Sequence, residues 1–316
     1  LVTGGCGAIG SEVINRLKYV HSDTLFINLD LLTYAGKREH IEAPYTNYRF
    51  VHGNITDADM INTILCIYKP QYLIHFAAET HVDNSFGNSL TFTKTNVQGT
   101  HTLLECVKEY MQTNEFHMFV HMSTDEVYGS VEDSEAPRRE DAIFQPSNPY
   151  AATKAAAEMI CKSYELSFKL PIVIVRCNNA ISKYQHEEKL IPRVIKSIIN
   201  AQPIPIHGEG KSKRTFIHAY DIADAMDIIM KKGTPGKCYN IGTDMEYTVL
   251  EVVHVVIELI TQKKQKDISK YITYVKDRPF QDYRYCIDST ALRELGWIEK
   301  ISFTEAISDV ISRYVA

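Results

Sequence analysis

The sequence predicts an α/β protein: a Rossmann-type doubly wound parallel sheet joined to a smaller C-terminal α/β lobe that would bind a substrate. Three observations support this. Short apolar segments alternate with helix-period segments through the first half, a glycine-rich loop follows the first apolar segment, and five prolines divide the chain after residue 177 into shorter pieces. Of the 316 residues, 45% are hydrophobic and 23% charged, which excludes a disordered, collagen-like or coiled-coil chain.

The first half contains six expected strands, at 1–3, 24–29, 48–52, 71–76, 116–122 and 171–176. The segments between them have a helical period. Ile9, Val13, Leu17 and Val20 share one helix face, and further helices are expected at 88–112 and 149–168. Because helices separate the strands, the sheet should be parallel with right-handed crossovers.

The second half should form helices at 189–200, 220–231, 248–262 and 303–315 and strands at 204–207 and 237–241. We expect residues 1–177 to form the first domain and residues 178–316 the second lobe, with residues 216–241 returning to the first domain.

Charge and cysteine usage narrow the class of protein. Lys and Arg number 34 and Asp and Glu 39, a formal charge of −5 that argues against a nucleic-acid partner. No apolar run is long enough for a membrane span, and no secretory signal is expected. The seven cysteines are scattered and form no C-x-x-C pair, so we expect free thiols, no metal site and a cytoplasmic location.

The opening LVTGGCGAIG indicates a dinucleotide-binding loop. Gly5, Gly7 and Gly10 form G-x-G-x-x-G directly after a strand and at the start of a helix, where backbone N–H groups can hold a pyrophosphate. Asp30 ends the next strand, twenty positions after Gly10. A carboxylate there accepts a bond from a ribose 2′-hydroxyl and repels a 2′-phosphate, so residues 1–177 should bind NAD rather than NADP.

Two further motifs suggest acid–base chemistry. Tyr150 and Lys154 lie four apart in YAATK, on one helix face, where the ammonium would favour the tyrosine phenolate as a base. HMSTDEVYG follows the strand at 116–122, so Asp125 and Glu126 should emerge at the carboxyl edge of the sheet, where ligands bind. One acid and one base would then face a single substrate.

These motifs together resemble the dTDP-glucose 4,6-dehydratase family of extended short-chain dehydrogenases/reductases. The resemblance rests on segments across nearly the whole chain, chiefly TGGCGAIG (3–10), LDLLTYAG (29–36), STDEVYG (123–129), NPYAATKAAAE (148–158) and HGEGKSKRTFIHAYDIADA (207–225). It implies a lyase of deoxysugar biosynthesis, such as that of rhamnose, which converts dTDP-glucose or UDP-glucose to the 4-keto-6-deoxyglucose nucleotide plus water. NAD would be reduced and reoxidised in each cycle.

The resemblance also implies roles for individual residues. Tyr150, helped by Lys154 and Thr124, would take the 4-hydroxyl proton; Glu126 would remove the C5 proton, and Asp125 would protonate the departing 6-hydroxyl. The implied cofactor contacts are Gly4, Gly7, Ala8, Ile9, Gly10, Asp30, Thr33, Asn54, Ile55, Ala77, Ala78, Thr95, Tyr150 and Lys154. The implied sugar-nucleotide contacts are Thr80, Thr124, Asn179, Lys189, Leu190, Pro205, His207, Arg214, Asn240 and Arg278. A homodimer through a four-helix contact of 88–112 and 149–168 is implied as well.

The sequence departs from the family pattern at three places. Asn54 precedes Ile55 where the family has Asp, although an amide oxygen can still accept a bond from the adenine amino group. Residues 181–183 read Ile-Ser-Lys in place of Tyr-Gly-Pro, and the segment usually reading Arg-Pro-Gly-His ends here in Phe280 and Gln281.

Other readings of the same scaffold stay open. A nucleotide-sugar 4-epimerase or a glucuronate decarboxylase would share the fold, but the acid pair Asp125 and Glu126 favours dehydration. A non-catalytic NAD-binding protein is a third alternative, against which the intact Tyr150 and Lys154 argue. The choice between thymidine and uridine is not decided by the sequence, since one methyl group is worth only about 1–3 kcal/mol.

Overall fold

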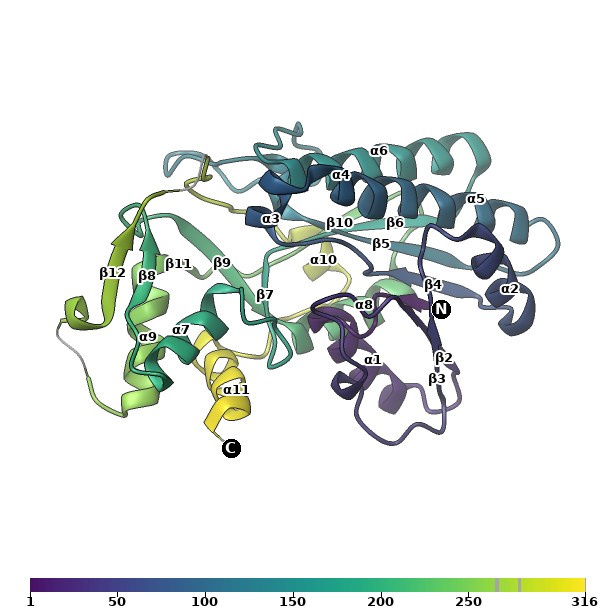
Figure 1. Ribbon diagram of the computed structural model, residues 1–316. Helices are drawn as coiled ribbons and strands as arrows, with labels where there is room; N and C mark the ends of the chain where they lie inside the picture. The colour runs from purple at the N-terminus through teal and green to yellow at the C-terminus, as the bar shows by residue number, and fades with distance from the viewer. Residues whose placement is uncertain (265–266, 278–279, 316) are drawn as a thin grey trace.

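The main sheet has seven parallel strands in the order β10-β6-β5-β4-β1-β2-β3 (Figure 1). We describe residues 1–264, 267–277 and 280–315 of a computed structural model. The strands are β1 (Val2–Thr3), β2 (Phe26–Asp30), β3 (Tyr48–His52), β4 (Tyr72–His75), β5 (Met118–Thr124), β6 (Ile172–Cys177) and β10 (Cys238–Ile241). The strand order reverses between β1 and β4, and this switch point opens a crevice at the carboxyl ends of the strands. The predicted Rossmann-type fold is confirmed.

Helices cover both faces of this sheet (Figure 1). α1 (Ala8–Val20) and α8 (Ala219–Lys232) pack together on one face, and α2 (Ala58–Tyr68), α5 (Thr100–Tyr110) and α6 (Pro149–Phe168) lie on the other. Strand β5 shows why helices pack on both faces of the sheet. Met118, Val120 and Met122 join the core under α1 and α8, whereas Phe119 joins the core under α5 and α6. Its nearly continuous apolar sequence therefore suits a strand buried on both faces.

The helix expected over 88–112 is interrupted. After α3 (Val82–Gly87) the chain forms α4 (Ser89–Phe92), a π-helical segment Thr93–Gly99, and then α5. The hydroxyl of Thr100 donates to the Asn96 carbonyl at 2.6 Å and thereby competes with the regular backbone pattern. The π turn places buried Asn96 where its amide bonds both the N–H (2.8 Å) and the carbonyl (3.0 Å) of Glu79, which fixes the loop after β4.

A second lobe has its own apolar core and two small sheets, β11-β9-β7 and β12-β8. Its elements are β7 (Asn179–Ile181), α7 (Leu190–Ile199), β8 (Ile204–His207), β9 (Lys213–His218), β11 (Glu246–Thr248), α9 (Val249–Thr261), the 3₁₀ turn Ser269–Tyr271, β12 (Ile272–Val275) and α11 (Phe303–Val315). The chain crosses back to the main sheet twice, through β10 at its edge and through α10 (Thr290–Glu294), which is followed by fully buried Trp297. Within the described residues, no helix is both long and apolar enough to cross a membrane.

Candidate active site

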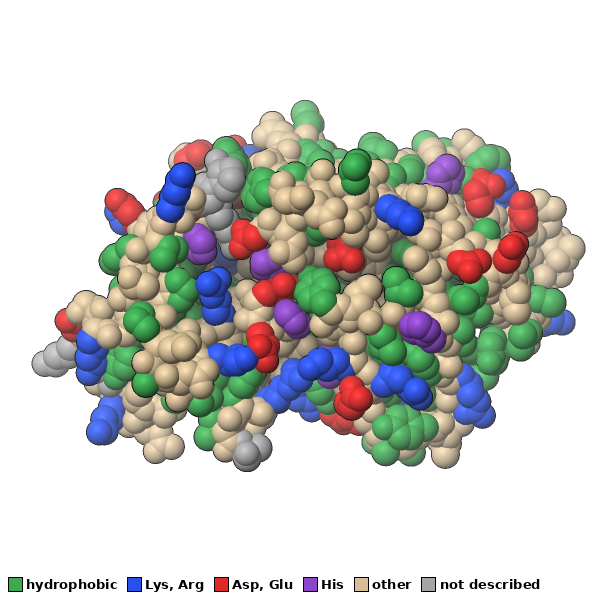
Figure 2. Space-filling view, in the orientation of Figure 1, with side chains coloured by type: hydrophobic (Ala, Val, Ile, Leu, Met, Phe, Trp, Pro, Cys, Tyr) green, Lys and Arg blue, Asp and Glu red, His purple; other side chains and the backbone are tan. Residues whose placement is uncertain are grey.

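A cleft of about 500 Å³ runs along the carboxyl edge of the main sheet, between that sheet and the second lobe. Acidic, basic and histidine side chains gather across the middle of the molecule where the two parts meet (Figure 2). Every expected cofactor contact lines this cleft. So do the expected sugar-nucleotide contacts Thr80, Thr124, Asn179, Lys189, Leu190, Pro205, His207 and Arg214.

The glycine loop packs closely against neighbouring backbone, which side chains at two of its glycines would prevent. Gly4 has φ +72°, and a Cβ on it would lie 2.4 Å from the Ala77 nitrogen; a Cβ on Gly10 would lie 2.5 Å from the Gly4 carbonyl oxygen. α1 begins at Gly7 without a side-chain cap, so its first N–H groups and its positive dipole end are available to an anion. Gly5 instead packs against Asn28 and is not part of the cleft lining.

Asp30 closes the sugar end of this dinucleotide cradle. Its Oδ2 accepts the Cys6 N–H and its Oδ1 the Leu32 N–H, both at 2.8 Å, so the carboxylate is held rigidly with lone pairs left for a ribose hydroxyl. Asn54 is the residue expected beside the adenine. Its amide oxygen accepts the Thr56 N–H at 3.0 Å and keeps a second lone pair. The glycine loop and Asp30 therefore fit NAD.

Tyr150 and Lys154 project from α6 into the cleft and are both buried. The sequence predicts that Lys154 favours the Tyr150 phenolate, and the structure gives the Lys154 ammonium another bonding partner. The Lys154 ammonium donates to the Met122 carbonyl at 2.6 Å, and burial, followed by the Glu126 charge, raises the pKa of Tyr150. Burial also lowers the pKa of Lys154 to about 8.

The two acids follow β5 in a 3₁₀ turn, Asp125–Tyr128. Burial is the largest cause in both, and it raises the pKa of Glu126 above its usual value and the pKa of Asp125 to about 7, to which the neighbouring Glu126 charge contributes. Glu126 lines the cleft. A carboxyl group with a pKa near 7 can serve as a proton donor at neutral pH.

Asp125 itself lies just behind the cleft lining. Its Oδ1 accepts the Thr124 hydroxyl at 3.2 Å and its Oδ2 the Asn178 amide at 2.7 Å, and only 2% of the residue is exposed. Thr124 and Asn178 line the cleft, whereas Asp125 is not part of the lining. These two contacts fix the position of the Asp125 carboxyl group.

One expected substrate contact, Asn240, is not part of the cleft lining. Asn240 is fully buried, and its amide accepts the Tyr128 hydroxyl and donates to the Arg138 and Asp288 carbonyls, so it supports the fold behind the site. The expectation that Asn240 contacts substrate is therefore wrong for this structure. Arg278 lies outside the described residues.

Two residues that contact Glu126 are not predicted from the sequence as part of the site. Asn148 caps α6 by accepting the Ala151 N–H at 2.8 Å, and its Nδ2 donates to Glu126 Oε2 at 3.0 Å. Tyr285 lies 3.4 Å from the same oxygen and donates to Asp282 at 2.5 Å. Asn before Pro149 is a helix-start signal that could have indicated Asn148; nothing local indicates Tyr285, which arrives from 159 positions away.

The substrate end of the cleft carries the positively charged side chains of Arg214 and Lys189. Arg214 is held by its Nη2 bond to the Asp282 carbonyl at 3.0 Å and packs 4.3 Å over the Tyr285 ring. Lys189 donates to the Thr80 carbonyl at 3.1 Å. Among residues 1–264, 267–277 and 280–315, no group of three or more His, Cys, Asp or Glu side chains is arranged to hold a metal ion.

Comparison with known proteins places the chain in a family. The model for GDP-mannose 4,6 dehydratase matches residues 1–310. A trifunctional UDP-glucose 4,6-dehydratase/3,5-epimerase/reductase of Arabidopsis thaliana is 40% identical over 99% of this chain, which spans 47% of that relative's length. The dTDP-D-glucose 4,6-dehydratase of Mus musculus is 38% identical over 99% of this chain and 88% of its own length.

A solved structure agrees with these sequence relatives. The dTDP-glucose 4,6-dehydratase DesIV from Streptomyces venezuelae, with NAD and a second ligand bound, superposes with a TM-score of 0.91 at 35% identity, covering 99% of this chain and 95% of that one. A UDP-glucose 4-epimerase from Thermotoga maritima superposes with a TM-score of 0.88 at 26% identity, covering 99% and 97%. The chain thus belongs to the dTDP-glucose 4,6-dehydratase family of extended short-chain dehydrogenases/reductases.

Proposed function

We propose that this chain is an NAD-dependent nucleotide-sugar 4,6-dehydratase acting on dTDP-glucose or UDP-glucose. One observation carries the proposal: Glu126 lines the same cleft as Tyr150 and Lys154, Asp125 bonds the lining residues Thr124 and Asn178 from behind, and both acids have raised pKa values. A simple dehydrogenase needs only the tyrosine and lysine. An acid and a base beside them suit an elimination, in which one proton is removed and another is given to the leaving group.

The cofactor in this proposal is NAD, which the glycine loop and Asp30 fit. When bound, NAD would accept a hydride from C4 of the sugar and later return it to C6. The first turn of α1 would hold its pyrophosphate, and Asp30 a ribose hydroxyl. A relative of this family, DesIV, binds NAD in its solved structure.

The remaining chemistry belongs to the chain's own side chains. Tyr150 takes the proton of the 4-hydroxyl as C4 becomes a ketone, and Thr124 and Lys154 flank that exchange. The ketone makes the C5 proton acidic, because the carbanion left behind is an enolate. Glu126 takes this proton, the C5–H electrons form the C5–C6 double bond, and the C6–O bond breaks. The departing hydroxyl receives a proton from Asp125 and leaves as water, after which Glu126 returns its proton to C5 as C6 is reduced.

The epimerase alternative is less well supported. The epimerase structure shares the fold, but at 26% identity it lies further from this chain than the dehydratase relatives do. The nucleotide base stays open, since relatives named for UDP-glucose and for dTDP-glucose match equally across the chain. Arg214 supplies a guanidinium suited to the substrate diphosphate.

We also propose a cytoplasmic homodimer. All seven cysteines are free, which suits a reducing compartment. Large apolar side chains are exposed along α4 and α6, namely Leu90, Met159, Leu166 and Phe168, with Leu90 81% exposed. A second copy of the same helices would bury them in a four-helix contact.

The proposal is tested by incubating the protein with NAD and either dTDP-glucose or UDP-glucose. We expect a product that has lost one water and, after alkali, shows the absorbance of a 4-keto sugar. Substrate labelled with deuterium at C4 should give a product labelled at the C6 methyl. A product with C4 inverted and no loss of water would establish the epimerase instead.

A further inference from the structure

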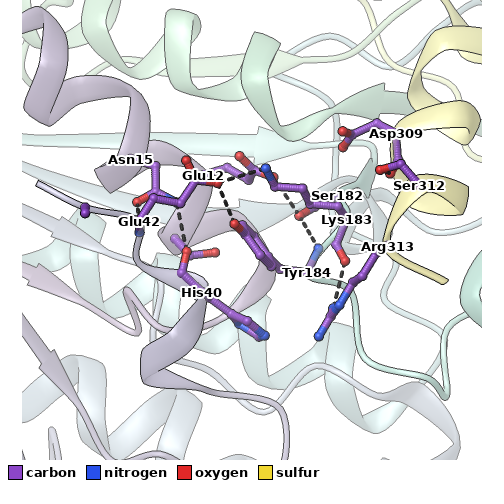
Figure 3. Close-up of polar contacts among 12 residues, drawn as sticks. Glu12, Asn15, His40, Glu42, Ser182, Lys183, Tyr184, Asp309, Ser312 and Arg313 are labelled. Atoms are coloured by element: carbon purple, nitrogen blue, oxygen red, sulfur yellow. Dashed lines mark hydrogen bonds and ion pairs between the residues drawn. The ribbon is translucent and has the colours of Figure 1, made fainter. Parts of the chain in front are cut away.

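A second cluster of polar side chains joins the two lobes beside the cleft (Figure 3). We call it the interlobe clamp and define it as Glu42 from the first domain together with Lys183, Tyr184 and Arg313 from the second lobe. It contains Lys183, one of the positions where this sequence departs from its family. The clamp lies outside the catalytic groups described above, and only Tyr184 reaches the cleft lining.

The contacts of the clamp converge on one carboxylate and one carbonyl. Lys183 Nζ lies 2.8 Å from Glu42 Oε1, and the Tyr184 hydroxyl donates to the same oxygen at 2.6 Å. These two bonds lower the pKa of Glu42, which keeps the carboxylate charged. From α11, Arg313 Nη1 donates to the Lys183 carbonyl at 2.7 Å, so the turn is held from both sides.

The residue before Lys183 adds a separate tie between the lobes. Ser182 Oγ donates to Glu12 Oε1 of α1 at 3.2 Å and accepts the Tyr184 N–H at 3.0 Å (Figure 3). A Gly-Pro pair at 182–183 would have neither the hydroxyl nor the ammonium. The Ile-Ser-Lys departure therefore replaces a stiff turn by one that is anchored through side chains.

The clamp is connected to the glycine loop through His40. The His40 Nδ1 bonds the Cys6 carbonyl at 2.8 Å, and its ring stacks on Tyr184 with centroids 4.7 Å apart. Burial lowers the pKa of His40, which keeps the ring neutral. Tyr184 and Gly7 line the same cleft, so a run of contacts from Cys6 through His40 links the glycine loop to Tyr184 of the second lobe.

We propose that the interlobe clamp retains NAD in the cleft between turnovers, with Lys183 as its positioning residue. The proposal rests on the proposed function, in which the cofactor is regenerated in every cycle and has no need to leave. In this proposal, release of a dinucleotide from the glycine loop requires Tyr184, which lines the same cleft and stacks on His40, to move away from the loop. The bonds at Glu42 and Arg313 oppose that movement.

The test measures how fast the protein, first loaded with labelled NAD, releases that label after dilution into excess unlabelled NAD. No sugar nucleotide is present. Lys183 and Glu42 are 31% and 44% exposed in their side chains, so the ion pair is modest, and we expect Lys183→Met to release NAD roughly fivefold faster. Glu42→Gln should do the same, and the double variant should be no faster than either single one. Lys183→Arg should restore slow release.

Lys231→Met is the matched control, because Lys231 pairs with Asp227 at 2.7 Å within α8 and joins no lobes. It should leave release unchanged. A purely structural role for Lys183 would lower the melting temperature of the protein without NAD and leave release as in the unaltered chain. By contrast, we expect kcat at saturating NAD to be unaltered in Lys183→Met while half-saturation by NAD rises.

Release at the unaltered rate in both Lys183→Met and Glu42→Gln would overturn the proposal. Faster release in these variants, combined with no dehydration of either sugar nucleotide by the unaltered chain, would support the clamp and refute the proposed function. The two hypotheses are therefore separated by readouts that do not depend on each other.

Discussion

At the scale of single residues, the environment of each acid decides its role. Burial dominates both pKa values, but Asp125 is almost fully enclosed and hydrogen-bonded by Thr124 and Asn178, whereas Glu126 faces the cleft. With a pKa of about 7, Asp125 is partly protonated at neutral pH, and Glu126 lines the cleft, where it can receive a proton. These different environments support the proposed division of the two carboxyl groups into proton donor and proton acceptor.

Glu126→Gln should lower kcat by at least about 100-fold, since removal of a general base typically costs that much. Oxidation at C4 needs Tyr150 and not Glu126, so reduced cofactor should accumulate on the protein. Absorbance near the NADH band in a single-turnover experiment checks this. Normal turnover in this variant would remove Glu126 from its role as the base.

The pH dependence of kcat should be bell-shaped. Glu126 must be ionised to act as a base, so activity should rise as pH rises through its elevated pKa. Asp125 must be protonated to act as an acid, so activity should fall as pH rises through about 7. In the Asp125→Asn variant, the pH profile of the residual kcat should keep its rise on the acid side and lose its fall on the alkaline side. An unchanged fall on the alkaline side would assign that fall to another group.

Asp30→Ala should weaken NAD binding by about tenfold and leave NADP binding nearly as it is, because a hydrogen bond to a charged group contributes about 1.5–3 kcal/mol. Titration of each dinucleotide by calorimetry gives both affinities. Equal losses for NAD and NADP would contradict a role for Asp30 at the ribose.

At the scale of secondary-structure elements, α6 shows how a helix start can also build a site. Asn148 caps the helix and in the same geometry holds Glu126 Oε2, while Tyr150 and Lys154 follow on the first two turns. The start of α6 thus positions the cap and the tyrosine by its backbone, and it holds Glu126 of the neighbouring 3₁₀ turn through the Asn148 side chain. Loss of this cap should therefore affect stability and catalysis together.

Asn148→Ala should cost about 1 kcal/mol of unfolding free energy and lower kcat as well. Asn148→Asp keeps a capping oxygen but places a negative charge beside Glu126, so stability should recover while kcat stays low. Denaturant unfolding and initial rates measure the two effects. Asp57→Ala is the control, because Asp57 caps α2 through the Met60 N–H at 3.0 Å, far from the acids, and should lose stability only.

At the scale of the whole molecule, the two lobes share one cleft, and helices of the first domain expose apolar side chains. The carboxyl ends of the sheet supply the dinucleotide side, and β8 and β9 supply the other side through Pro205, His207 and Arg214. The helices on the outer face of the sheet expose Met159 (54%) and Leu166 (55%), seven positions apart on α6. This spacing puts both on one side of the helix.

Leu166→Glu combined with Met159→Glu should convert a dimer to a monomer without unfolding it, because each charge would be buried in the proposed four-helix contact. Sedimentation velocity gives the assembly state and circular dichroism the fold. Ile67→Glu on α2, 65% exposed in the unaltered chain, should leave the assembly unchanged. A monomer in the unaltered chain would rule out the proposed contact.

The sequence by itself determined the alternating strands and helices, the phosphate loop, Asp30 and the catalytic motifs, because each depends on residues near one another in the chain. The apolar periodicity, the glycine spacing and the Tyr-x-x-x-Lys motif are local signals. The residues of the two motifs meet because the carboxyl ends of parallel strands lie at one edge of the sheet. The tertiary structure alone decided the direction of the Lys154 ammonium, the withdrawal of Asn240 from the cleft, the contact of Tyr285 with Glu126, and the clamp between Glu42 and Lys183. These depend on burial and on contacts between residues 32 to 159 positions apart, which no local pattern specifies.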